Sequence, residues 1–579
     1  MRKIKIIFLF IILLLIPYVF FGQACSQKQF QVDPQKVNDC GVQCNENLSL
    51  KSDDPYLKYQ WHLFNNGDFG GVIGEDLHLQ STWGQGILGN EITVAVVDDG
   101  IDLNHPDLLE NKSDLSWNFA NPTLGQDVSL PTDPNKEGHG TCVAGLLGAR
   151  GNNGLGVSGI SPLVKIAGYN ISGQTSVSYT AAATATFNNI SHISKIDVSN
   201  NSYGPIDGLG VYTTVDQSWI DAIETGLEEG RSGLGTIYVW AAGNGYSNDR
   251  SNYDSISSFY GVIPVCAVGH DGKIANYSEA GSNLWVCGFG SSNVQVGLTT
   301  TDLLLSKGFN KGGSSVNFKD LNFTNNFSGT SAAAPVVSGV VSLILNYANI
   351  IKKELSWRDV KLILAKSARK SNDTGWSTNG AGYNVHDNYG FGIIDVDNSI
   401  ETVKNWSSIK NEPFLNSEFP KFDYFFVGQK IPIALNLQNA LVSEFQISNA
   451  NELKVQKIEY LDVKIKLDHY NWGDLKLVLE HEGITNDGSV FNTKSILIQT
   501  HSCKFKDSAS TDLKIKNCSE LDNGQVGDSN YEFIFGTSKH LGESPNGTWR
   551  IRVYDTNSTN SDISKQGQLN GWRLKFYGS

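Results

Sequence analysis

The sequence predicts an α/β domain with a mostly parallel sheet, followed by an all-β sandwich. The chain has 579 residues, which is longer than one hydrophobic core usually serves. From about residue 54 to residue 410, short apolar runs alternate with helical patterns. From about residue 411 to residue 579, apolar and polar residues alternate between turns rich in glycine and asparagine. We therefore expect two domains of different class.

The apolar runs of the first domain have the length of buried strands. Examples are Ile92–Val97 and Ile237–Ala242, and a helical pattern covers Ala332–Asn346. Such strands, alternating with helices, form a parallel sheet that has helices on both faces. The second domain contains alternating segments that indicate antiparallel strands of a sandwich, namely Leu475–Glu480, Trp549–Tyr554 and Trp572–Tyr577.

Residues 1–24 have the pattern of a signal peptide. A basic start precedes an apolar run over residues 6–21, and the small residues Gly22 and Ala24 stand before Cys25. A membrane anchor is the alternative, although the run is short for a bilayer span, and lipidation of Cys25 also stays open. Since no second apolar run is long enough to span a bilayer, we expect a secreted protein, extracellular or periplasmic.

Composition and charge narrow the class of function. Hydrophobic residues make up 40% of the chain and charged residues 18%, which is typical of globular proteins. The net charge of -14 argues against a nucleic-acid partner and would attract calcium or basic peptides. Eight cysteines in an exported protein indicate disulfides; Cys503 and Cys518 look like a local pair, but sequence leaves the connectivity open.

Three motifs stand in the order Asp, His, Ser. Asp98 ends an apolar strand, His139 opens an apolar helix after Gly138, and Ser331 opens another helix within Gly-Thr-Ser-Ala. A serine hydroxyl is a poor nucleophile unless a histidine takes its proton, and a carboxylate must hold that imidazole in the right tautomer. Ser331 is therefore the expected nucleophile, His139 the base and then the acid, and Asp98 the orienting carboxylate.

A fourth motif completes this arrangement. The apolar strand that ends at Trp240-Ala-Ala is followed by Gly243-Asn244-Gly245, a turn that presents a side-chain amide. We expect Asn244 to donate to the oxyanion of the transition state. Each motif alone is weak, but together, in this order, they have the chain order of subtilisin rather than that of chymotrypsin or the α/β-hydrolases.

Further motifs resemble the kexin/furin branch of the subtilisin-type serine proteases. They are Asp-Asp-Gly-Ile at 98–101, Asn-His-Pro-Asp-Leu at 104–108, Asn-Asn-Gly-Leu-Gly at 152–156, Ser-Tyr-Gly-Pro at 202–205, Tyr-Ser-Glu-Ala at 277–280 and Trp-Arg-Asp at 357–359. Pro-Asn-Gly-Thr-Trp at 545–549 and Gly-Trp-Arg-Leu at 571–574 resemble the P domain of that branch. The resemblance implies a subtilisin-like peptidase domain at 54–410 and a P domain at 411–579.

The resemblance also implies cleavage after Arg or Lys. Asp254 matches the acid that meets the side chain of P1, the residue before the cleaved bond, and Asp99 matches an acid near P2. The substrate backbone would lie against Ser202, Tyr203 and Gly204. Lys136 and Thr180 stand where the family has further acids, so strict selectivity at P2 and P4 is not expected.

Calcium is the implied cofactor, with two or more ions. One set of ligands, behind the P1 pocket, would be Asp207, Asp249 and Glu279. Hard oxygen ligands from distant segments suit calcium, which accepts six to eight of them. The second set would be the side chains of Asp54, Asp107 and Asn153 with the carbonyls of Arg150, Leu155 and Val157.

The segment 25–53 is a short N-terminal extension. It is shorter than an unaided folding unit and contains no dibasic pair for self-cleavage, so we expect no full propeptide. A separate chaperone is a possible partner in its place. Two alternatives stay open: a broad-specificity subtilisin-like protease, and an exported binding or toxin protein in which proteolysis is secondary.

Overall fold

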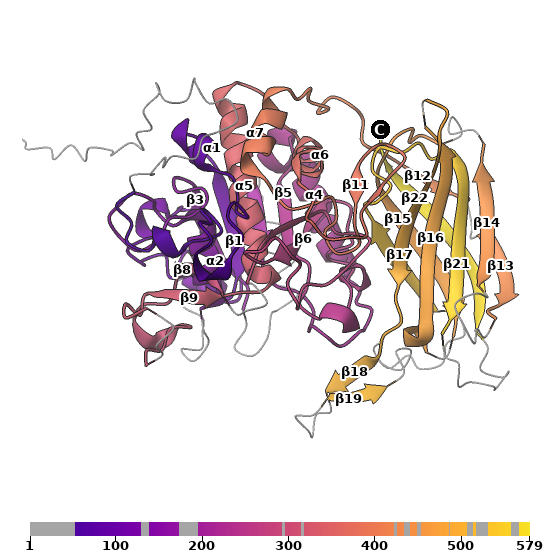
Figure 1. Ribbon diagram of the computed structural model, residues 1–579, viewed down its shortest axis with the longest axis horizontal. Helices are drawn as coiled ribbons and strands as arrows, with labels where there is room; N and C mark the ends of the chain where they lie inside the picture. The colour runs from indigo at the N-terminus through magenta and orange to yellow at the C-terminus, as the bar shows by residue number, and fades with distance from the viewer. Residues whose placement is uncertain are drawn as a thin grey trace, which may run out of the picture.

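The structure is a computed structural model in which two domains lie side by side (Figure 1). The expected signal peptide, nearly all of the extension, Lys136, Thr180 and Cys518 lie outside the residues that it describes. The described residues are 52–128, 138–172, 195–291, 296–313, 318–421, 425–432, 440–448, 453–469, 471–485, 487–506, 513–516, 531–556 and 567–579.

The first domain is built on a seven-stranded sheet in which every pair of neighbouring strands is parallel. This confirms the α/β class. The strand order is β2-β3-β1-β4-β5-β6-β7. The strands are β1 (Thr93–Asp98), β2 (Trp117–Asn118), β3 (Lys165–Asn170), β4 (Val198–Asn201), β5 (Ile237–Ala241), β6 (Val262–Val268) and β7 (Val286–Phe289).

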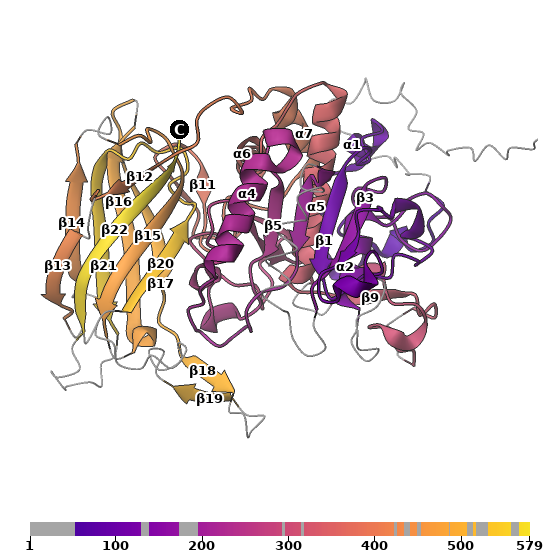
Figure 2. The ribbon, with the colours of Figure 1, turned by 180° about the vertical axis from the view of Figure 1, so that it is seen from behind.

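Helices cover both faces of this sheet. α5 lies in front of the sheet in Figure 1 and α4 lies in front of it in Figure 2, where the molecule is seen from behind. The helices are α1 (Gln80–Gly84), α2 (His139–Gly148), α4 (Gln217–Gly233), α5 (Thr330–Ile350), α6 (Trp357–Ser367) and α7 (Val396–Lys404). Short antiparallel pairs join β8 (Leu298–Thr301) with β9 (Phe323–Phe327) and β10 (Ser377–Thr378) with β11 (Asn384–Val385).

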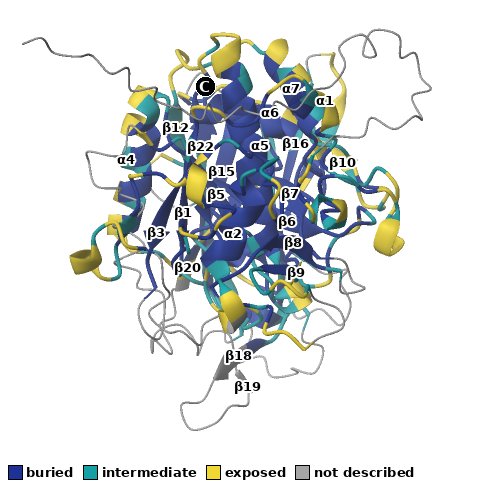
Figure 3. Ribbon diagram, turned by 90° about the vertical axis from the view of Figure 1, so that its left-hand side faces the viewer, coloured by how far each residue is buried: buried dark blue, intermediate teal, exposed yellow. Residues whose placement is uncertain are grey.

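The central helix α5 is buried over most of its length (Figure 3). Among the described helices it is the one long and apolar enough to cross a membrane. Its apolar side chains pack inside the domain, with Val336, Val340 and Leu343 fully buried. Packing in the core therefore accounts for its composition.

The second domain is an all-β sandwich, as the alternating pattern predicts. One sheet has the order β12-β22-β15-β20 with β13 also paired to β22, and the other has the order β14-β21-β16-β17. The strands are β12 (Leu415–Phe419), β13 (Phe425–Lys430), β14 (Leu441–Ile447), β15 (Ile458–Asp468), β16 (Leu475–Ile484), β17 (Val490–Ile498), β20 (Tyr531–Thr537), β21 (Gly547–Asp555) and β22 (Gln568–Gly578). A separate hairpin, β18 (Cys503–Lys506) with β19 (Leu513–Lys516), extends from the sandwich (Figure 1).

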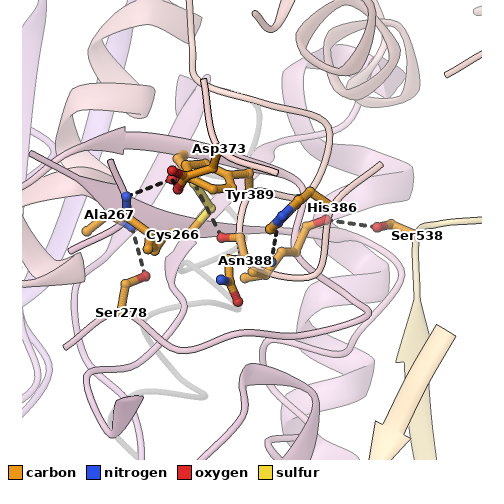
Figure 4. The surroundings of a disulfide bond; sticks show 11 residues. Cys266, Ala267, Ser278, Asp373, His386, Asn388, Tyr389 and Ser538 are labelled. Atoms are coloured by element: carbon orange, nitrogen blue, oxygen red, sulfur yellow. Dashed lines mark hydrogen bonds between the residues drawn. A yellow bond between two sulfur atoms is a disulfide. The ribbon is translucent and has the colours of Figure 1, made fainter. Parts of the chain in front are cut away.

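Among the described cysteines, the expected presence of disulfides is confirmed in part. Cys266 and Cys287 form a disulfide between paired positions of β6 and β7 (Figure 4). Cys503 is also disulfide-bonded, and Cys142 is buried in α2. The pairing of Cys503 with Cys518 stays a prediction because Cys518 is outside the described residues.

Candidate active site

The three residues of the expected triad lie where strands and helices of the first domain end or begin. Asp98 is the last residue of β1, His139 the first residue of α2 and Ser331 the second residue of α5. Nδ1 of His139 lies 2.9 Å from Oδ1 of the nearly buried Asp98. The hydroxyl of Ser331 donates to the carbonyl of Ser202 at 3.2 Å. The structure thus joins Asp98 and His139 directly.

No hydrogen bond between His139 and Ser331 is among those of the described residues. Catalytic hydrogen bonds are often long without substrate and shorten when substrate binds. The expected triad is therefore joined at Asp98 and His139, while the hydroxyl of Ser331 is held by the carbonyl of Ser202.

Asp99 holds the start of α2 beside the triad. Its Oδ2 accepts from the backbone N–H of His139 at 3.2 Å, and its Oδ1 accepts from the N–H of Gly140 at 2.9 Å. These two bonds satisfy free N–H groups of the first helical turn. A Cβ at Gly140 would lie 2.4 Å from the carbonyl oxygen of Gly100, so glycine allows the helix to approach the end of β1 this closely.

The two aspartates also set the charge of the imidazole. Burial disfavours the charged ring, but Asp98, by its charge and hydrogen bond, and Asp99, by its charge, outweigh it and raise the pKa of His139 to about 9. Burial and the charge of Asp98 raise the pKa of Asp99 to about 6, against the opposing effect of His139. The free enzyme therefore favours a protonated His139 at neutral pH.

Asn244 follows β5 in a turn opened by Gly243, whose φ is 109°. Its Oδ1 accepts from both the backbone N–H and the hydroxyl of Thr330, at 2.8 and 3.0 Å. Because these donors fix the oxygen, the orientation of the amide is set. The Asn244 Nδ2 donates to Oδ2 of Asp207 at 3.2 Å, and its backbone N–H donates to Oδ1 at 2.7 Å.

A cavity of about 210 Å³ begins at Ser331 and reaches Asp254. Its lining includes the three residues expected to face substrate, Ser202, Tyr203 and Gly204, together with Asp207 and Asn244. Asp254 accepts a 2.8 Å hydrogen bond from the hydroxyl of Thr213. Burial first, and then the charges of Asp249 and Asp207, raise the pKa of Asp254 well above its usual range. A cationic side chain in the cavity would reverse this effect.

Asp249 and Glu279 bond to backbone N–H groups of residues that directly follow Asp207 and Asn244 of the cavity lining. Burial and neighbouring carboxylates raise the pKa of Asp249 to about 7 and that of Glu279 well above its usual range. Glu279 Oε1 accepts from the N–H of Gly245 at 2.9 Å, while its buried Oε2 has no hydrogen-bond partner. Mutual repulsion and an unsatisfied buried oxygen fit a cation bound by Asp207, Asp249 and Glu279. Their ligand atoms do not all lie within 4.8 Å of one another, so an ion would draw them together.

The second expected calcium set also assembles in space. Asn153 Nδ2 donates to Asp107 Oδ1 at 2.9 Å, and the N–H of Asn153 donates to Asp54 Oδ1 at 3.0 Å. Burial above all raises the pKa of Asp107 to about 7. These side-chain oxygens already accept N–H bonds, including those from Leu155 and Val157. The fit to an ion is weaker here, and ligation by the carbonyls of Arg150, Leu155 and Val157 stays a prediction.

Sequence reasoning missed a buried cluster formed by His481, His540 and Glu543. In the described part of the chain it is the one group of three metal-ligand side chains whose ligand atoms lie within 4.8 Å of one another. Oε2 of Glu543 lies 2.8 Å from Nδ1 of His481 and 3.0 Å from Nδ1 of His540. Because the members already bond to each other, hydrogen bonding accounts for the cluster.

Comparisons with known proteins agree with the fold and with the class of enzyme. The arrangement defines a subtilisin-like serine endopeptidase. Residues 89–392 match the Subtilase family and residues 509–576 match the Proprotein convertase P-domain. Neuroendocrine convertase 2 of Drosophila melanogaster is 30% identical over 540 residues, which cover 91% of this chain and 72% of the relative. The same convertase of Rattus norvegicus is 29% identical over 92% of this chain and 75% of its own length.

Solved structures show the same two-domain fold. The serine protease of Aeromonas sobria has a TM-score of 0.73 at 25% identity, over 91% of this chain and 96% of its own. A second crystal structure of that protease, in complex with a chaperone, has a TM-score of 0.74 at 25% identity, over 91% and 95%. The chain therefore belongs to the subtilase family, in its kexin/furin-like branch with a P domain.

Proposed function

We propose that this protein is a secreted, calcium-dependent serine endopeptidase that hydrolyses peptide bonds after Arg or Lys. The observation that carries the proposal is the cavity that begins at Ser331 and reaches the buried carboxyl of Asp254. A P1 side chain in this cavity would place its cationic end against Asp254 while its carbonyl lies at the Ser331 hydroxyl. A charge-assisted pair of this kind is stronger than a neutral hydrogen bond.

The proposed chemistry follows from the contacts of the triad. Ser331 Oγ attacks the carbonyl carbon, and Nε2 of His139 accepts the proton and then passes it to the leaving amine. Asp98 accepts from Nδ1 at 2.9 Å, which keeps Nε2 free to act as the base. The same carboxylate stabilises the imidazolium formed during the attack.

Asn244 would stabilise the oxyanion. The two bonds from Thr330 hold its carboxamide oxygen, so the amide N–H group is directed to Asp207, and both Asn244 and Ser331 line the cavity. An oriented donor costs little reorganisation when charge develops on the substrate oxygen. Removal of such a donor costs about 100- to 1,000-fold in turnover.

Calcium would be held by Asp207, Asp249 and Glu279, with a second ion at Asp54, Asp107 and Asn153. When bound, an ion supplies positive charge that offsets the repulsion between the carboxylates. Asp249 accepts from the backbone N–H groups of Gly208 and Gly210, at 3.2 and 3.3 Å, so the ligand set is tied to the loop of Asp207. A bound ion would thus keep this loop ordered, and with it the wall of the P1 cavity that Asp207 lines.

Export and a chaperone are part of the proposal. The signal-peptide pattern of residues 1–24 supports secretion. A separate chaperone would assist folding, and the similar protease of Aeromonas sobria has been crystallised with a chaperone.

The test is the replacement Asp254→Asn, with peptide substrates that differ only in Arg or Leu at P1. Loss of one partner of a buried charge pair costs about 2–5 kcal/mol, so kcat/KM for Arg should fall roughly 30-fold or more. Leu substrates should change far less. Asp221→Asn, which removes an exposed carboxylate on α4, is the matched control, and Ser331→Ala supplies the inactive baseline. Equal losses for Arg and Leu would show a broad-specificity protease instead.

A further inference from the structure

The loop that carries Asp254 is held by the sandwich domain. Tyr253 directly precedes Asp254, and Tyr212 directly precedes Thr213, the residue that donates to Asp254. The N–H of Thr213 donates to the carbonyl of Tyr253 at 3.0 Å, which joins the two segments. The rings of both tyrosines are buried in the hydrophobic core of the sandwich, where Tyr212 packs edge-on against Trp472.

Residues 497–501, at the end of β17 and just after it, make polar contacts with these segments. The hydroxyl of Tyr253 donates to the carbonyl of Gln499 and accepts from its N–H, both at 3.1 Å. Nε2 of His501 lies 2.9 Å from the carbonyl oxygen of Gly210. Asn252 Nδ2 donates to the carbonyl of Leu497 at 2.6 Å. Residues 497–501 of the second domain therefore bond to both segments of the first domain that support Asp254.

We infer that residues 497–501 form part of the P1 specificity apparatus and that Tyr253 is a positioning residue that acts through Asp254. The inference rests on the proposed role of Asp254 in meeting a basic P1 side chain. The second domain then fixes where the buried carboxyl stands, in addition to covering apolar surface.

Two physical arguments support an effect of this loop on the selectivity for the P1 side chain. A charge pair in a poorly solvated cavity depends steeply on the distance and angle between its members. A second cavity, of about 290 Å³, is lined by Tyr253, Gln499 and His501. The loop that carries Tyr253 and Asp254 therefore has free volume beside it, into which it can relax when its bonds to residues 497–501 are removed. Such relaxation would displace Asp254.

The experiment is Tyr253→Phe in the full-length protein, which removes the bridging hydroxyl and keeps the buried ring. For P1 Arg substrates, kcat/KM should fall about threefold to tenfold, mainly through KM, which is the range of one net hydrogen bond. Leu substrates should stay within about twofold. Tyr554→Phe, on the more exposed side of β21, is the matched control and should change neither. His501→Gln, which removes the ring nitrogen facing Gly210, should give the same selective loss.

The Asp254→Asn background separates the possible outcomes. If Tyr253 acts through Asp254, Tyr253→Phe should cause no further loss of Arg selectivity in that background. Equal losses for Arg and Leu, or an unchanged Arg-to-Leu ratio with both Tyr253→Phe and His501→Gln, overturn the inference while Asp254 keeps its role. If Asp254→Asn itself leaves the ratio unchanged, the proposed P1 specificity fails.

Discussion

At the scale of single residues, His139 is controlled by two carboxylates with different tasks. Asp98 bonds to the imidazole, whereas Asp99 bonds to the backbone of the helix that carries it. Both negative charges raise the pKa of His139, and a general base, the role proposed for His139, acts only when neutral. Activity should therefore be lost as the pH falls through a pKa well above 6.5.

We expect kcat/KM of the free enzyme to rise with pH up to about 9, the pKa of His139. Asp99→Asn should shift this rise, the acidic limb of the pH profile, to lower pH, because it removes one of the charges that favour the imidazolium. The measurement is the pH profile of kcat/KM with substrates that carry Ala at P2. Asp102→Asn, a nearby carboxylate that accepts from the N–H of Asn104, is the control and should leave the limb in place. An unchanged limb in Asp99→Asn would contradict the assignment.

The three residues proposed to react could be selected from the sequence, but several residues that orient them in the structure could not. Asp98, His139 and Ser331 each stand at the boundary of an apolar segment, and boundaries are visible in a pattern. The bonds from Thr330 to Asn244 and from Thr213 to Asp254 join residues 86 and 41 positions apart. A local sequence pattern does not reveal such contacts, although Thr330 stands next to Ser331, the proposed nucleophile.

At the scale of elements, the turn between β10 and β11 is hydrogen-bonded to the sandwich domain. Glu543 accepts from the N–H of Gly380 at 2.8 Å, and Asn379 Nδ2 donates to the carbonyls of Lys539 and Leu541. Although burial opposes ionisation, hydrogen bonds from His481 and His540 hold the pKa of Glu543 below its usual range. The cluster that sequence reasoning missed thus joins the turn between β10 and β11 of the first domain to β16 of the sandwich.

Glu543→Gln should destabilise the protein strongly. Removal of one partner from a buried ionic group costs about 3–5 kcal/mol, since the remaining polar groups stay buried. At roughly 2–4 °C for each kcal/mol, the melting temperature should fall by about 10 °C in a thermal melt. Glu482→Gln, which removes a half-exposed carboxylate facing Arg550 on the same sheet, should cost at most about 1 kcal/mol. Similar melting temperatures for the two variants would show that the cluster contributes little.

At the scale of the whole molecule, each of the two hydrophobic cores contains side chains from the other domain. Tyr212 and Tyr253 of the first domain are buried in the sandwich core, and Tyr460 and Tyr577 of the sandwich belong to the core of the first domain. A buried ion pair between Arg358 and Glu459 also crosses the boundary. The periodicity of the sequence predicts two domains of the right class. It does not predict that buried side chains of each domain pack into the core of the other.

A chain that ends at Trp406 should therefore be insoluble or rapidly degraded when expressed, because truncation would expose Tyr212 and Tyr253 and leave Arg250 without its bond to the carbonyl of Ile496. The measurement is soluble yield, with activity, against the full-length protein. In the full chain, Tyr212→Ala should lower stability by about 3–5 kcal/mol, as expected for a buried aromatic side chain. Val442→Ala, at a position on β14 that is 41% exposed, should cost far less. A soluble and fully active truncated chain would show that the sandwich is an independent binding module. In that case residues 497–501 could not be needed to hold Asp254 in place.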